Sequence, residues 1–173
     1  MTTVNHSAAR ATTVRDLGIV DSLVQLSFAV QGIVGGVTGR YDSSIIQTRL
    51  LGALRGRELT MAQIARLLNL DKSSTTGLVD RAQSKGFVVR TVSREDGRSI
   101  RVSLTAQGRK ITDRVILEVA REIDAVVGDL SAPERRRLSQ LASKFVYLDA
   151  DARGIDLEAG QTTMAHERKG GSK

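Results

Sequence analysis

The side chains best suited to recognising another molecule lie between Asp71 and Arg98. The run "DKSSTTGLVDRAQSK" (71–85) combines hydroxyl side chains with two lysines and an arginine, and "SREDGRS" (93–99) sets arginines around Gly97. Hydroxyl groups exchange hydrogen bonds with phosphates and base edges, and guanidinium groups bind phosphate or guanine through two parallel bonds. These residue types at this spacing indicate recognition of a polyanion.

The sequence contains little that could support catalysis. It has no cysteine, and its two histidines, His6 and His166, lie near opposite ends in polar surroundings. Neither GxxxxGK[ST] nor GxGxxG occurs, and the neighbouring acids Glu95 and Asp96 have no apolar pocket that could raise a carboxyl pKa. We therefore expect no enzyme, no catalytic residue, no metal and no cofactor.

The positive charge is confined to one third of the chain. Residues 55–110 hold 12 Lys or Arg and 5 Asp or Glu, which accounts for the whole net charge of +7. A solvated basic face could explain this charge alone, but a localised excess is typical of a module that binds nucleic acid.

The apolar run at 22–39, "SLVQLSFAVQGIVGGVTG", has no charged residue. Its two glutamines and four glycines make it a poor membrane-spanning helix, and the Gly32/Gly36 and Gly35/Gly39 spacing permits close helix packing. The first residues, "MTTVNHSAARATTV", lack the apolar core of a secretory signal. We expect no membrane partner and a cytoplasmic protein.

Apolar spacing and capping residues predict the order of the elements. Helices are expected over 17–38 and from 45 to near 55, and Thr60 with Gln63 forms a capping box for a short third helix. Asp71 caps the fourth helix, which Gly86 ends, and its inward stripe is predicted to be Thr75, Leu78, Val79 and Ala82.

The second half of the chain begins with two β-branched runs. Residues 87–92 and 99–104 are expected to be strands joined by a turn at Gly97. Thr105 caps a helix over about 106–128, and Ser131 with Glu134 begins another. The expected inward residues of the first of these helices are Ile111, Val115, Val119, Ile123 and Val126.

This order predicts a mainly α fold with a small β-hairpin wing (α+β), a winged helix-turn-helix lobe within a helical homodimer frame. The fourth helix would enter a major groove, and Arg94 or Arg98 of the wing would reach a minor groove, with Asp96 orienting a guanidinium. The expected divisions are a flexible tail (1–15), N-terminal helices (16–55), the DNA-binding lobe (56–105), dimerisation helices (106–148) and a disordered tail (149–173).

The run 71–111 resembles the MarR family of bacterial transcription regulators. The resemblance depends on the order and spacing of Leu78-Val79-Asp80-Arg81, Gly86, Arg90, Asp96-Gly97-Arg98, Val102, Leu104-Thr105 and Gly108. It implies a homodimer with interlocked terminal helices, which binds a pseudo-palindromic double-stranded DNA operator, acts as a repressor and is released by a small aromatic or phenolic acid.

Two groups of site residues follow. The predicted DNA contacts are Lys72, Ser73, Ser74, Thr76, Arg81, Arg94, Asp96 and Arg98, and the predicted effector contacts are Phe28, Gly32 and Arg49. Gly77 departs from the family pattern, because many relatives carry a longer polar residue there. Arg81 could contact phosphate or pair with Asp80 or a wing acid.

A second function stays open. The lobe could be an architectural or protein-interaction module that binds DNA largely without sequence preference and has no effector. Operator specificity separates these two readings, because an architectural protein binds all duplexes about equally.

Overall fold

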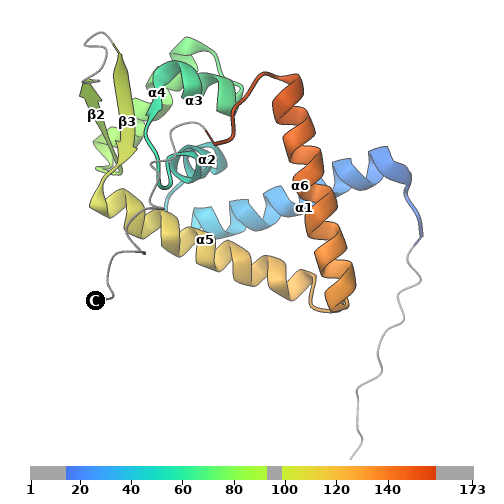
Figure 1. Ribbon diagram of the computed structural model, residues 1–173. Coiled ribbons are helices and arrows are strands. Elements are labelled where there is room, and N and C mark those ends of the chain that lie inside the picture. Colours follow the sequence, from blue (N-terminus) through green and yellow to red (C-terminus); the bar gives the residue numbers. More distant parts are fainter. Residues whose placement is uncertain (1–14, 93–98, 159–173) are drawn as a thin grey trace, which may run out of the picture.

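The computed structural model describes residues 15–92 and 99–158 (Figure 1). It confirms a mainly helical fold with a small antiparallel sheet. The elements are α1 (Gly18–Gly39), α2 (Ile45–Ala53), β1 (Leu59–Thr60), α3 (Met61–Leu68), α4 (Lys72–Ser84), β2 (Val88–Val92), β3 (Ile100–Leu104), α5 (Ala106–Val126) and α6 (Ala132–Ala152).

The helices after α1 begin where side chains can satisfy free backbone N–H groups. The Thr60 hydroxyl accepts from the Gln63 N–H, and the Gln63 side chain accepts from the Thr60 N–H at 2.8 Å, which confirms the predicted capping box. Asp71 and Thr105 cap α4 and α5 as predicted. These caps fix where the helix-turn-helix and the frame helix start.

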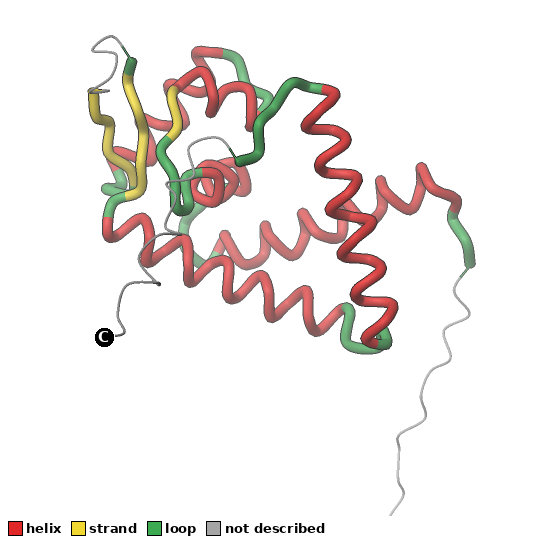
Figure 2. Tube along the Cα trace, viewed as in Figure 1, coloured by secondary structure: helices red, strands yellow, loops and turns green. Residues whose placement is uncertain are grey.

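The sheet has one strand that sequence patterns did not predict. β1 pairs with β3, and β3 pairs with β2, all antiparallel, in the order β1-β3-β2. Val102 on the central strand is opposite Leu59 on one side and Arg90 on the other. β1 therefore attaches the start of α3 to the base of the wing (Figure 2).

The core of the lobe is aliphatic. Its fully buried side chains include Leu50 of α2 and Leu54 directly after it, Ile64 of α3, and Leu78 and Val79 of α4. The predicted inward stripe of α4 is confirmed, because Thr75, Leu78, Val79 and Ala82 are all buried. This packing fixes the opposite face of α4 toward solvent.

The long helices form a frame below this lobe, in which α1 packs along α5 (Figure 1). Arg40 at the end of α1 forms ion pairs with Glu118 and Glu122 of α5 at 3.2 and 3.1 Å, and Tyr41 donates a hydrogen bond to Glu118. The frame leaves many large apolar side chains exposed: Leu17, Ile19, Val20, Val24, Leu26, Phe28 and Val30 on or beside α1, and Leu117, Val126, Leu138, Leu141, Phe145, Val146, Tyr147 and Leu148 on α5 and α6.

By length and composition α1 could also cross a membrane, and it is the one such helix among residues 15–92 and 99–158. A single helix of this kind is weak evidence, since helices buried in soluble proteins have the same composition. α6 exposes large apolar side chains as well, which a lipid-spanning α1 would not explain.

Two expectations for the C-terminal half were wrong. Val126 of α5 is 70% exposed rather than inward. α6 continues to Ala152, past the expected boundary at 148, because Ala150 is buried and its carbonyl accepts from the Ile155 N–H at 2.8 Å. The part of the tail up to residue 158 is thus anchored, and Arg57 donates to the Leu157 carbonyl at 2.6 Å.

Candidate nucleic-acid interface

The first turn of α4 is held by one carboxylate. Asp71 accepts from the backbone N–H of Ser74 and from the hydroxyls of Ser73 and Ser74, each at 2.7 Å. The Ser74 N–H bond, followed by the two hydroxyl bonds, keeps the pKa of Asp71 well below its usual range. Because each hydroxyl gives its hydrogen to Asp71, its oxygen lone pairs remain available to accept from an incoming donor.

The two threonines that follow have different positions. Thr75 is buried, and its hydroxyl donates to the Asp71 carbonyl at 2.8 Å, while exposed Thr76 donates to the Lys72 carbonyl at 2.9 Å. Thr76 lines a groove between α3 and α4 that Arg66 and Lys72 border with two cations. An outward threonine can accept a hydrogen bond or contact a thymine methyl group.

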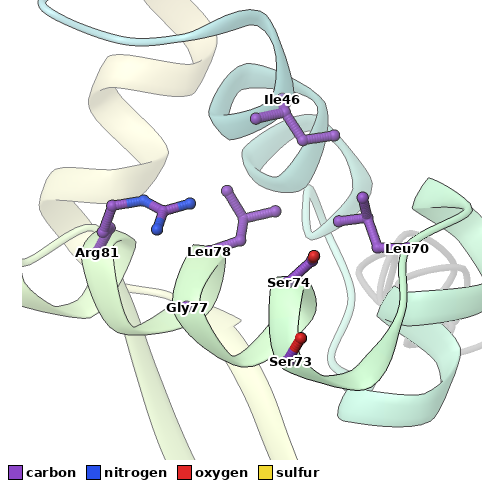
Figure 3. Close-up of a pocket in the computed structure, with 7 residues that line it drawn as sticks. All are labelled: Ile46, Leu70, Ser73, Ser74, Gly77, Leu78 and Arg81. Atoms are coloured by element: carbon purple, nitrogen blue, oxygen red, sulfur yellow. The ribbon is translucent and has the colours of Figure 1, made fainter.

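The middle of the outward face of α4 has no side chain. Ser73, Gly77, Asp80 and Ser84 share this face by their three- and four-residue spacing. A Cβ added at Gly77 would lie 3.3 Å from Nη1 of Arg81. Figure 3 shows the Arg81 side chain extending along the helix beside Gly77, toward the hollow that Ser74, Leu70 and Ile46 also line.

The remaining charges of α4 connect it to its neighbours. Asp80 forms an ion pair with Arg90 of β2 at 2.7 Å, and Arg90 also donates to Gln83 at 2.8 Å. Lys85 contacts the Asp42 carboxylate at 3.3 Å. Asp80 therefore pairs with Arg90 and not with Arg81, and the wing is fixed to α4 at its base.

The structure brings five of the predicted DNA-contacting residues together on and around one face: Lys72, Ser73, Ser74, Thr76 and Arg81. The other three, Arg94, Asp96 and Arg98, lie outside the described residues, so their roles stay predictions. β2, the strand that leads to them, lies beside α4, where Arg90 pairs with Asp80.

The three predicted effector contacts do not line a closed pocket in the described part of the chain. Phe28 is 62% exposed and Gly32 is exposed on α1, and Arg49 is exposed on α2. None of the described residues, 15–92 and 99–158, covers Phe28, so a closed pocket at this place needs a further covering element such as another chain. The effector site stays a prediction.

Sequence reasoning missed the residues that position α4. In the sequence, Arg90 stands out only as part of the family resemblance, and no pattern singles out Gln83 or Asp42. Their partners are distant in the chain or on another element, so no spacing rule could reveal them. The one available signal was an arginine on the same strand face as the apolar Val88, in the strand that follows the helix carrying Asp80.

These features define a protein of the winged helix-turn-helix class: α4 is a capped helix with an open outward face, it packs in a helix-turn-helix with α3, and a β-hairpin follows it. Residues 36–99 match the sequence model of the MarR family. The HTH-type transcriptional regulator YdgJ of Bacillus subtilis is 30% identical over 126 residues, which cover 70% of this chain and 77% of the relative. The HTH-type regulator YfiV of the same organism is 40% identical over 73 residues, 42% of this chain and 46% of YfiV.

Solved structures have the same fold. A mutant of MarR from E. coli complexed with operator DNA superposes with a TM-score of 0.61 at 23% identity, over 73% of this chain and 92% of that one. NadR in complex with 4-hydroxyphenylacetate gives 0.64 at 24% identity, over 78% and 96%. The chain belongs to the MarR family and is an HTH-type transcriptional regulator.

Proposed function

We propose that this protein binds a pseudo-palindromic operator as a homodimer and represses transcription from it. The observation that carries the proposal is the outward face of α4, where small side chains leave the backbone accessible between Lys72 and Arg81. Such a face lets the helix lie deep in a major groove, whereas an unpartnered surface helix gains stability from long Glu/Lys pairs. The operator complex of a MarR structure supports the same use of the fold.

The exposed apolar residues support the dimer. α6 exposes Leu138, Leu141, Phe145 and Leu148, and α1 exposes a second apolar series. So many exposed large apolar side chains on two helices are typical of a protein interface. Two copies joined through these helices would set two α4 helices on one face of the duplex, in successive major grooves.

The proposal extends to an effector: a small aromatic or phenolic acid binds the protein and releases it from the operator. It draws support from NadR, which was solved with 4-hydroxyphenylacetate. In this chain Phe28 and Gly32 would contact the ring and Arg49 the carboxylate, in a pocket closed by the dimer. A cytoplasmic location accompanies this role.

The test is selection of bound sites from a random duplex pool at about physiological salt. An inverted repeat with half-site centres about one helical turn apart is expected from a symmetric dimer. Recovery of no motif, with binding that collapses as salt rises, would refute the operator reading and favour an architectural module. On the recovered operator, Arg98→Ala should weaken binding and lessen its salt dependence, because one cation is removed from the wing.

A further inference from the structure

The missing side chain at Gly77 leaves a space on α4 that the Arg81 side chain borders. α4 is exposed at Ser73, Asp80 and Ser84, and Gly77 lies at the centre of this small-residue face. Glycine inside a helix costs about 1 kcal/mol relative to alanine, and the added methyl group would meet only the far end of the flexible Arg81 side chain. Helix stability and packing therefore do not explain the glycine.

Arg81 is placed to use this gap. Helical side chains point toward the N-terminus of their helix, so Arg81 extends back along α4 toward Gly77, four residues or about 6 Å of helix away. Its Nη1 atom comes within 3.3 Å of the position that a Cβ of Gly77 would occupy. The guanidinium thus lies near the middle of the outward face although its Cα is in the third turn (Figure 3).

The charged side chains beside Arg81 that could compete for a ligand, or pair with Arg81, have other partners. Asp80 is held by Arg90, and Lys85 by Asp42. Among the residues that the structure describes, Arg81 has no ion-pair partner, and its side chain borders the open hollows on both sides of it. Arg81 can therefore turn its fork of donors toward a ligand without breaking an existing bond.

We propose that Arg81 is the base-reading arginine of α4, and that the missing side chain at Gly77 is what gives its guanidinium access to a guanine in the major groove. The guanidinium presents two parallel N–H donors that match the O6 and N7 acceptors of guanine. Ser73 and Ser74 flank this contact with free acceptor lone pairs, since their hydrogens are held by Asp71. Lys72, at the first turn, contacts phosphate.

This inference rests on the proposed function, because only a sequence-specific protein has a base to read. Arg81→Lys keeps the charge and removes the two-donor fork. We expect it to abolish the preference for G·C at one base pair of each half-site. The lost discrimination should lie between about fivefold and roughly 150-fold, the range of one good bidentate contact.

Two further variants make the test specific. Gly77→Ala adds a methyl group beside the guanidinium without contacting backbone, so the protein should fold while losing preference at the same base pair. The double variant should lose no more than Arg81→Lys alone, since both changes remove one contact. Lys72→Ala is the matched control, which should weaken all duplexes by a similar factor and leave the selected motif unchanged.

The experiment is site selection with the full chain and each variant, followed by titration of single-base operator variants. If the unaltered protein recovers an inverted repeat and Arg81→Lys recovers the same motif, Arg81 is not the base-reading residue and operator binding still stands. If the unaltered protein recovers no motif, operator binding itself fails. Loss of one symmetric pair of positions in Arg81→Lys supports the inference.

Discussion

Replacing Gly108 with alanine should separate α5 from the base of the wing. A Cβ at Gly108 would lie 1.9 Å from the carbonyl oxygen of Phe87, whereas carbon and oxygen atoms in weak C–H···O contacts stay about 3.3 Å apart. The clashing atom is backbone, and the same carbonyl accepts the Thr105 N–H at 3.0 Å. The helix must therefore shift or this hydrogen bond must break.

The size of the effect follows from three contributions. Forcing an extra methyl group into a packed contact costs about 1–3 kcal/mol, and a lost hydrogen bond costs about 1 kcal/mol more. The higher helix propensity of alanine returns about 1 kcal/mol. We expect Gly108→Ala to lower the free energy of unfolding by about 1–3 kcal/mol, measured by urea unfolding at one fixed protein concentration, because association affects the midpoint.

Gly52→Ala is the matched control for this substitution. Gly52 is also helical, and a Cβ there would meet nothing within 4 Å. The same exchange should stabilise the protein by up to about 1 kcal/mol. Because both variants change the unfolded chain alike, their difference isolates the Phe87 contact. Equal stability of the two variants would show that α5 does not sit against Phe87 as described.

Three other outcomes are expected. Hydrogen bonds keep the pKa of Asp71 below its ordinary 3.8, so its carboxylate stabilises the fold above about pH 4, and this contribution is lost as the pH falls below that. In thermal melts, Asp71→Asn should therefore make the stability of the protein depend less on pH on the acid side. An unchanged dependence of the melting temperature on pH would contradict this. Leu141→Glu, on the exposed face of α6, should give a folded monomer in sedimentation with far weaker operator binding, and a persistent dimer would place the interface elsewhere. Arg90→Ala should change the melting temperature little, since its partner Asp80 is largely exposed, yet weaken operator binding measurably by fluorescence anisotropy.

Local signals in the sequence were sufficient for most of the fold. The Thr60 and Asp71 caps need only residues two or three positions away, and the stripe of Thr75, Leu78, Val79 and Ala82 follows from helical periodicity. Gly108 is predictable only as part of a family pattern, and the structure gives its physical reason in the Phe87 carbonyl.

Contacts between distant segments were not predictable in the same way. β1 has two residues and exists because it pairs with β3, about forty residues later. α6 ends later than its sequence pattern predicts, because Ala150 is buried only once the chain has folded back. The sequence leaves open whether Asp80 pairs with Arg81. In the structure Arg90, which lies on β2, takes Asp80 as its partner instead.

The exposed frame helices and the small face of α4 are linked by the energetics of DNA binding. The outward face of α4 carries mainly small side chains and supplies few ionic contacts besides Arg81. A single lobe therefore depends on flanking cations such as Lys72 and Arg66 for its phosphate contacts. Joining two lobes makes the second binding event intramolecular, which can raise affinity by orders of magnitude without any new contact. If the protein binds an operator as the proposed dimer, an α4 with so small an outward face gains most from the second lobe, and the apolar surfaces of α1 and α6 become a requirement of that binding.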